Sequence, residues 1–152
     1  MDAVDYKILQ QLLVQGRITW SELANGLGLS APATAERVRR LEEHKVILGY
    51  TAQVNPAALD YRLTAFIAVS LQHPQARLSF LQRIQGLPEV LECHHMTGED
   101  DYLLKVRSRH TQDLERIISE EIKGLPGILR TRTTIVLSTV KETLAVPLGD
   151  MD

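Results

Sequence analysis

The sequence predicts an α+β protein, in which an N-terminal winged helix-turn-helix domain precedes a C-terminal ferredoxin-like βαββαβ sandwich domain. Two observations lead to this fold class. Residues 1–50 carry three short helical patterns with a glycine-containing turn before the third, which is the order of a helix-turn-helix. Residues 62–141 carry the order strand, helix, strand twice, and the echo of GLPEVL at 86–91 in GLPGIL at 124–129 marks the two halves.

The composition is that of an ordinary globular chain, with 44% hydrophobic and 24% charged residues and a formal net charge of −2. This balance argues against nucleic-acid binding by bulk charge. Arg37, Arg39, Arg40 and Lys45 lie close together, so any nucleic-acid footprint is expected to be local. The acidic start lacks the order of a secretory signal, no apolar run is long enough for a membrane span, and Cys93 has no partner for an internal disulfide. We therefore expect a cytoplasmic protein.

Apolar spacing and capping chemistry predict the first two helices. The apolar residues at helical spacing in the first helix are Val4, Ile8 and Leu12. This helix is expected to end before Gly16. Thr19 and Glu22 have the spacing of a capping box, so a second helix begins there. That helix is expected to be about two turns long, because Gly26 and Gly28 break it.

The third helix carries the candidate DNA contacts. Ser30 is a good N-cap, and the helix is expected to run to about His44. The predicted inward stripe is Ala35, Val38 and Leu41, which leaves Ala33, Thr34, Arg37 and Arg40 pointing outward. Arginine side chains can pair with guanine edges or with phosphate groups. The predicted DNA-binding residues are Ser30, Ala33, Thr34, Arg37, Arg39 and Arg40.

A second interpretation of this helix stays open. The stretch RVRRLEEHK is also typical of a solvated amphipathic helix with charge pairs such as Arg39 with Glu43.

The segment after the third helix sets the domain boundaries. KVILGYTAQV predicts a glycine-centred turn into a strand, which suits a wing or a linker, and Asn55-Pro56 ends it. The predicted organisation is a helix-turn-helix domain at 1–50, a linker strand and turn at 51–61, a βαββαβ effector-binding and oligomerisation domain at 62–141, and a tail at 142–152.

In the second domain, RLTAFIAVSLQ and DYLLKVRS alternate as strands, and a last strand is expected at roughly 128–141. The first helix is expected to bury Leu78, Leu81 and Ile84. The second is expected to begin near Thr111 and to bury Leu114, Ile117, Ile118 and Ile122. Both helices cover one face of the sheet, so the other face is expected to bury against a second chain. That face carries either Leu63/Ile67/Leu71 or Thr64/Phe66/Ala68.

Four stretches resemble the Lrp/AsnC family, the feast/famine transcription regulators. They are GRITWSELANGLGLS, ERVRRLEEHKVILGYTAQVNP, ECHHMTGEDDYLLKV and LPGILRTRTTIVLSTVKE, in family order and spacing. The resemblance implies a winged helix-turn-helix joined by a linker strand to a ligand-binding βαββαβ domain, in a homodimer that often assembles to an octamer. It implies that the helix at Ser30–His44 binds double-stranded DNA, and that an amino acid such as leucine sets the assembly or the operator affinity. The predicted function is therefore a nucleoid-associated transcription regulator with an amino-acid effector.

The stretch ECHHMTGEDDYLLKV places two histidines and three consecutive acids between two strands. His94 and His95 are neighbours on a strand and point to opposite faces, which argues against a shared metal ion. Three adjacent carboxylates in a polar turn lack the desolvation that tunes a catalytic pKa. No metal, cofactor or catalytic residue is therefore predicted, and a plain acidic surface turn stays open.

An effector site suits this turn better. Gly98 lets the backbone approach a small molecule, free N–H groups can hold its carboxylate, and Asp101 or Glu99 can take its ammonium group. The predicted effector-binding residues are Gly98, Glu99, Asp100, Asp101, Tyr102, Thr134 and Val136, the last two as a wall. We expect the site to lie where two dimers meet, because a turn at a sheet edge is too open to enclose a ligand alone.

Two other functions stay open from the sequence alone. One is an effector-independent architectural protein that wraps DNA. The other is an enzyme resembling the sirohaem decarboxylases, which the adjacent histidines suggest. The chain also departs from the family pattern at two positions: Glu99 stands in a turn that is commonly Gly-Asp-x-Asp-Tyr, and Trp20 stands where smaller polar residues are common.

Overall fold

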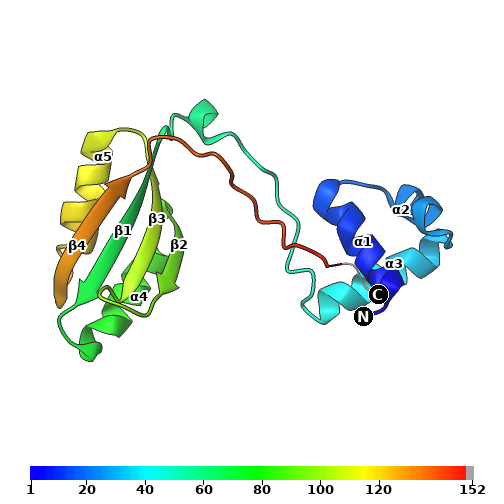
Figure 1. The fold of residues 1–152 in the computed structure, drawn as a ribbon, viewed down its shortest axis with the longest axis horizontal. Coiled ribbons are helices and arrows are strands. Elements are labelled where there is room, and N and C mark those ends of the chain that lie inside the picture. Colours follow the sequence, from blue (N-terminus) through cyan, green and yellow to red (C-terminus); the bar gives the residue numbers. More distant parts are fainter. Residues whose placement is uncertain (150–152) are drawn as a thin grey trace. The chain divides into compact units, whose positions relative to one another are not determined.

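The computed structural model describes residues 1–149, which form two compact units (Figure 1). The first unit holds Met1–Gln53 together with the C-terminal segment that starts at Glu142, and the second holds Val54–Lys141. Each unit has a hydrophobic core of its own. Within residues 1–149, no helix is long and apolar enough to cross a membrane.

Three helices build the first unit: α1 (Ala3–Val14), α2 (Trp20–Leu27) and α3 (Ala31–Glu43). The capping box predicted for α2 is confirmed, because the Glu22 N–H donates to Thr19 Oγ1 at 3.2 Å and the Thr19 N–H donates to Glu22 Oε2 at 2.9 Å. Gly28 ends α2 in the left-handed conformation, at φ 67°. The prediction that Gly26 also breaks the helix is wrong, because α2 continues to Leu27, which packs against the core.

The three helices pack around the buried side chains of Ile8, Leu9, Leu23, Val38 and Leu41. The inward stripe of α3 differs by one residue from the prediction. Thr34 is fully buried, whereas Ala35 is only partly buried. Residues 34, 38 and 41 recur one helical turn apart, so they form the stripe together, and the prediction that Thr34 points outward is wrong. The Thr34 hydroxyl donates to the Ser30 carbonyl at 3.1 Å, which satisfies this buried polar group.

The predicted wing or linker strand does not form. Between the C-cap residue His44 and the start of the sheet, the chain is irregular apart from one 3₁₀ turn, η1 (Pro56–Leu59). A β-strand needs a neighbour to accept and donate its backbone hydrogen bonds. Among residues 1–149, no strand pairs with residues 46–55, so that segment lacks a ladder.

The second unit is a four-stranded antiparallel sheet with the order β2-β3-β1-β4, which confirms the ferredoxin-like topology. The strands are β1 (Leu63–Leu71), β2 (Val90–His95), β3 (Tyr102–Ser108) and β4 (Ile128–Ile135). The helical segments are η2 (Pro74–Ala76), α4 (Arg77–Gln85), α5 (Thr111–Arg116) and the π-helical turn η3 (Ile117–Ile122), which extends α5.

The last strand is shorter than predicted. β4 ends at Ile135, and one further hydrogen bond joins the Val136 N–H to the Thr64 carbonyl at 2.9 Å. The neighbouring strand β1 begins at Leu63, so the chain beyond Val136 has no strand backbone beside it. The strand therefore stops before the predicted end near residue 141.

The alternation in β1 is confirmed, and it decides which sheet face is open. Ala65, Ile67 and Val69 are buried under α4 and α5 with Leu104, Val106, Phe80 and Ile117. The opposite side, called the outer face below, carries Thr64, Phe66 and Ala68, and these residues pair with Arg107, Lys105 and Leu103 of β3. No helix of this unit packs against the outer face, so the second of the two predicted alternatives lies on the side without helices. Thr64 and Phe66 are partly exposed there, and Ala68 is buried.

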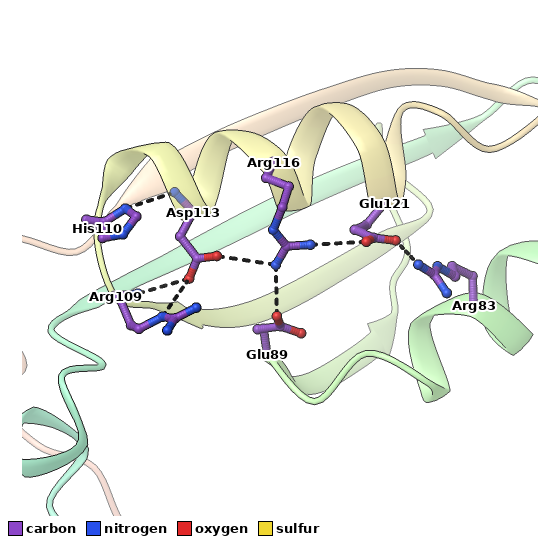
Figure 2. A network of polar contacts seen from close by, with 7 residues as sticks. All are labelled: Arg83, Glu89, Arg109, His110, Asp113, Arg116 and Glu121. Carbon is purple, nitrogen blue, oxygen red and sulfur yellow. Dashed lines mark hydrogen bonds and ion pairs between the residues drawn. The ribbon is translucent and has the colours of Figure 1, made fainter.

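Polar contacts hold the two helices in place beside the core (Figure 2). The Arg116 guanidinium donates to Glu89 at 2.9 Å and to Glu121 at 3.1 Å, and Glu121 also pairs with Arg83 of α4. Burial alone would raise the pKa of Asp113, but hydrogen bonds from the Arg109 N–H and from Arg116 outweigh it and hold that pKa below its usual range. The network thus links α4, α5 with its π-helical turn, and the approach to β2.

The helix α4 offers a matched pair of apolar residues for testing this packing. Phe80 is fully buried, whereas Leu78, which was predicted to be buried, is 68% exposed. We expect Phe80→Ala to lower the free energy of unfolding of the second unit by about 3–5 kcal/mol, because it leaves a cavity. Leu78→Ala should change it by less than ~0.5 kcal/mol. Urea unfolding followed by circular dichroism measures both, and similar losses in the two variants would contradict this core.

Candidate functional sites

The start of α3 presents small exposed residues on a well-capped helix. The Ser30 side chain accepts a hydrogen bond from the Ala33 N–H at 3.3 Å, and Pro32 occupies the first turn. Ser30, Pro32 and Ala33 are all exposed. Small side chains at an exposed helix start allow a close approach of the helix to a groove.

Arg37 is held by the first helix. Its Nη1 donates to Asp2 Oδ2 and to Asp5 Oδ1, both at 2.8 Å, and its side chain is only 25% exposed. Asp2 is also the N-cap of α1 and forms a capping box with Asp5. Hydrogen bonding to the Asp5 N–H, and then to Arg37, holds the pKa of Asp2 below its usual range. The structure thus places Arg37 in a contact between α1 and α3.

The other two arginines of α3 are exposed and differ in their partners. Arg39 donates to Glu36 at 2.7 Å and pairs with Glu43 along the same helix, as the solvated-helix interpretation predicts. Arg40 makes no hydrogen bond or ion pair within the part of the chain that the structure describes. Its positive charge interacts with Glu36 only at longer range. Trp20 is also exposed, at the first position of α2. Arg40 is therefore the cation of α3 most available to an outside anion.

A tight turn joins β2 to β3. The Met96 N–H donates to the Asp101 carbonyl at 2.9 Å and closes the turn. Gly98 has φ 125°, a conformation that residues with a Cβ rarely adopt, although no other atom lies near the place of its missing Cβ. Glu99 is exposed. The glycine is thus required by the backbone conformation of the turn.

Asp100 faces the protein rather than a ligand. Its carboxylate is 5% exposed, and it accepts hydrogen bonds from Ser70 Oγ at 2.8 Å, Arg130 at 3.1 Å and Arg132 at 2.6 Å. The Ser70 hydrogen bond and the two guanidinium groups hold the pKa of Asp100 below its usual range, against the effect of burial. The carboxylate thus already has three partners within the chain, and the predicted effector contact of Asp100 stays a prediction.

Asp101 has a free side to its carboxylate. Oδ2 accepts the Leu71 N–H at 2.6 Å, at the point where the register between β1 and β4 shifts. The Asp101 N–H donates to the Val69 carbonyl at 2.9 Å, so Val69 presents its backbone groups to the turn side of β1. Leu71, two residues further along, points its N–H to the same side by the ordinary alternation of a strand. No hydrogen bond of the described chain reaches Oδ1, so that oxygen can still accept one from outside.

Asp101 lines an open hollow of about 300 Å³ at the end of the sheet, called the Asp101 hollow below. Its other lining residues are Leu71, Gln72, His73, Pro74, Arg77, His95 and Tyr102. The Tyr102 ring is buried between Phe80 and His95, with ring centroids 4.9 Å apart in each case. The lining thus includes one acidic residue, one arginine, two histidines and several apolar residues.

Sequence reasoning missed Arg77 and His73, which lie far from the turn along the chain. Phe80 of α4 contacts Tyr102 at the start of β3, and this tertiary contact places the beginning of α4 beside the turn. The sequence also predicts Thr134 and Val136 as a wall of a site that a neighbouring subunit completes, and this stays a prediction. Within one chain, both residues lie away from the turn. Thr134 lies opposite Phe66, four residues along β4 from Arg130 at the turn, which is roughly 13 Å at the usual rise per residue. Val136 lies further away still, beside Thr64.

The two histidines point to opposite sides of β2, as predicted. His94 pairs with Glu92 at 3.1 Å, whereas His95 stacks on Tyr102. Across residues 1–149, no group of three histidine, cysteine, aspartate or glutamate side chains is arranged to hold a metal ion.

Two family models match the chain and together span most of it. The AsnC-type helix-turn-helix domain matches residues 1–42, and the Lrp/AsnC ligand binding domain matches residues 64–146. The leucine-responsive regulatory protein of Haemophilus influenzae is 39% identical over 145 residues, which is 94% of this chain and 87% of that protein.

Solved structures agree with the sequence relatives. A transcriptional regulator of Neisseria meningitidis in complex with L-Met has a TM-score of 0.92 and 32% identity, covering 97% of this chain and 96% of that one. A feast or famine regulatory protein of Mycobacterium tuberculosis complexed with L-methionine has a TM-score of 0.88 and 36% identity, covering 95% and 97%. The helix-turn-helix unit, the four-stranded unit and these likenesses agree, and the chain belongs to the Lrp/AsnC family of transcription regulators.

Proposed function

We propose that this protein regulates transcription by binding DNA through α3 while an α-amino acid bound in the Asp101 hollow changes its assembly or operator affinity. The observation that carries this proposal is the charge pattern of the hollow. An α-amino acid has an ammonium group and a carboxylate on adjacent atoms. Asp101 Oδ1 suits the first, and the Arg77 guanidinium suits the second.

The relatives support an amino acid as the effector. Two structural neighbours hold L-methionine, and a sequence relative is named as leucine-responsive. Apolar lining from Leu71 and Pro74 fits the side chain of such a ligand. In this proposal Asp100 does not contact the ligand, because its carboxylate is paired with Ser70, Arg130 and Arg132, and Gly98 acts through the shape of the turn.

For DNA, we propose a narrower contact set than the sequence predicts. Ser30, Ala33, Arg39 and Arg40 lie on the exposed side of α3, where a recognition helix meets the major groove. Arg37 instead orients α3 through its bonds to Asp2 and Asp5, and Thr34 belongs to the core. The protein would act wherever the chromosome lies, which for a bacterial or archaeal regulator is the cytoplasmic nucleoid.

The outer face supplies the proposed dimer contact. Phe66, Ala68 and Leu103 form an apolar centre, and the charged side chains around it are already paired within the chain, such as Glu92 with Lys105 and Asp100 with Arg132. An apolar centre with satisfied charges at its rim is the usual anatomy of a homodimer interface. An effector between two such dimers would then shift the population of octamers.

The DNA contact is tested by Arg40→Ala. We expect binding to a site selected from random DNA to weaken by about 1–3 kcal/mol if Arg40 pairs with a base. If it pairs with a phosphate, the slope of log affinity against log salt should fall by about one. Arg62→Ala removes an exposed cation outside the helix-turn-helix unit and serves as control. Equal affinity and equal slopes in all three proteins would remove Arg40 from the interface.

The dimer face is tested by Phe66→Asp in the full chain. A carboxylate buried without a partner is costly, so we expect a monomer at micromolar concentration. Leu78→Asp puts the same charge on the exposed side of α4, and this variant should remain at least dimeric. Sedimentation velocity reports both, and a Phe66→Asp protein that stays dimeric would place the interface elsewhere.

The effector site is tested by Asp101→Asn. Asparagine keeps an oxygen for the Leu71 N–H but loses the charge that holds an ammonium group. After a thermal-shift screen of the twenty amino acids, we expect calorimetric affinity for the best one to fall by about tenfold or more, since charge-assisted bonds contribute ~1.5–3 kcal/mol. Glu99→Ala should bind like wild type. Unchanged affinity in Asp101→Asn would leave the turn without a ligand role.

A further inference from the structure

The C-terminal segment of the chain, residues 142–149, belongs to the DNA-binding unit. It clusters with Met1–Gln53 and not with the sheet that precedes it (Figure 1). One side chain makes the connection: Leu148 is partly buried and packs against the core of α1, α2 and α3. The helix-turn-helix core therefore takes side chains from both ends of the sequence.

The contact is specific to Leu148 within this segment. Leu144 is 79% exposed and Val146 is 67% exposed, although both are also apolar. A segment that simply collapsed onto the nearest apolar surface would bury several of these side chains to a similar extent. Here the large apolar side chains of Leu144 and Val146 stay in solvent, and that of Leu148 reaches the core.

Because of this arrangement, two chain segments connect the two units instead of one. The chain leaves the first unit after Gln53, forms the whole second unit, and returns to the first unit at Glu142. The second unit is therefore inserted into the first, with a covalent connection at each of its ends. One connection enters β1, and the other leaves β4, the two strands that are paired at the centre and edge of the sheet.

We propose that residues 142–149 form a strap that completes the DNA-binding unit, with Leu148 as an added core residue. The strap would stabilise the docking of α1 against α3 and would give the effector-binding unit a second route to that pair of helices. The proposed stabilisation of the helices rests only on the packing of Leu148. The regulatory part rests on the proposed function, because it requires an effector in the Asp101 hollow and DNA on α3.

Hydrogen–deuterium exchange of the full chain tests the strap directly. Leu148 is partly buried, so Leu148→Ala should remove only part of the stabilisation that a completely buried leucine gives. We expect exchange of the backbone amides of α1 and α3 to speed up by roughly fivefold to tenfold at the slowest sites, with β1 and β3 unchanged. Leu144→Ala, the matched control, should exchange like wild type.

A chain that ends at Lys141 tests the regulatory part. In the shortened chain, we expect the backbone amides of α1 and α3 to exchange at least as fast as in Leu148→Ala. Its calorimetric affinity for the amino acid should equal that of wild type. The effector's influence on DNA affinity should be mostly lost. Unchanged exchange in both Leu148→Ala and the shortened chain would overturn the strap. Faster exchange with full effector control of DNA affinity would overturn its role in coupling. A wild-type protein that binds neither DNA nor amino acid would refute the proposed function and would leave the exchange result standing.

Discussion

The central strand β1 is hydrogen-bonded on both edges, to β3 on one side and to β4 on the other, and the rest of the second unit depends on this double pairing. Its alternating side chains divide the sheet into a helix-covered face and an outer face. Its register with β3 sets Val69 opposite Tyr102, which brings the turn before Tyr102 to the end of β1. The Leu71 N–H points to the same side of β1 as the Val69 carbonyl, and it donates to Asp101.

The same pairing separates two adjacent carboxylates into different roles. Successive residues leave the backbone on opposite sides, so Asp100 meets Ser70, Arg130 and Arg132 on the outer face, while Asp101 faces the hollow on the other side. Asp100 is buried with its charge neutralised, and this keeps the outer face free of unpaired charge close to its apolar centre. Asp101 keeps one oxygen available. The proposed dimer contact and the proposed ligand contact thus arise from neighbouring residues of one turn.

In the first unit, some arginines of α3 are paired with carboxylates, and one is exposed without such a partner. Asp2 and Asp5 hold Arg37 against α1, and Glu36 and Glu43 neutralise Arg39 along the helix. Of the three arginines of α3, Arg40 is the one that makes no hydrogen bond or ion pair with another residue of 1–149. A recognition helix with few free cations binds DNA of unrelated sequence weakly, because that binding is mostly electrostatic. Discrimination between sites would then depend on shape and on few contacts, which suits a regulator better than an architectural protein that coats DNA.

Local chemistry determined much of this protein from its sequence. The capping box at Thr19, the N-cap at Ser30, the alternation from Leu63 to Leu71 and the opposite orientation of His94 and His95 all depend on residues a few positions apart, and the structure has them as predicted. Tertiary structure decided what depends on partners distant along the chain. Thr34 is buried on the side of α3 that carries Val38 and Leu41, and Asp100 is neutralised by arginines of β4. Arg77 joins the hollow because α4 packs beside β3, the predicted wing is absent because no strand lies next to it, and Leu148 returns to the first core. Such contacts leave no local pattern, since the free energy that selects them comes from surfaces that meet only when the whole chain has folded.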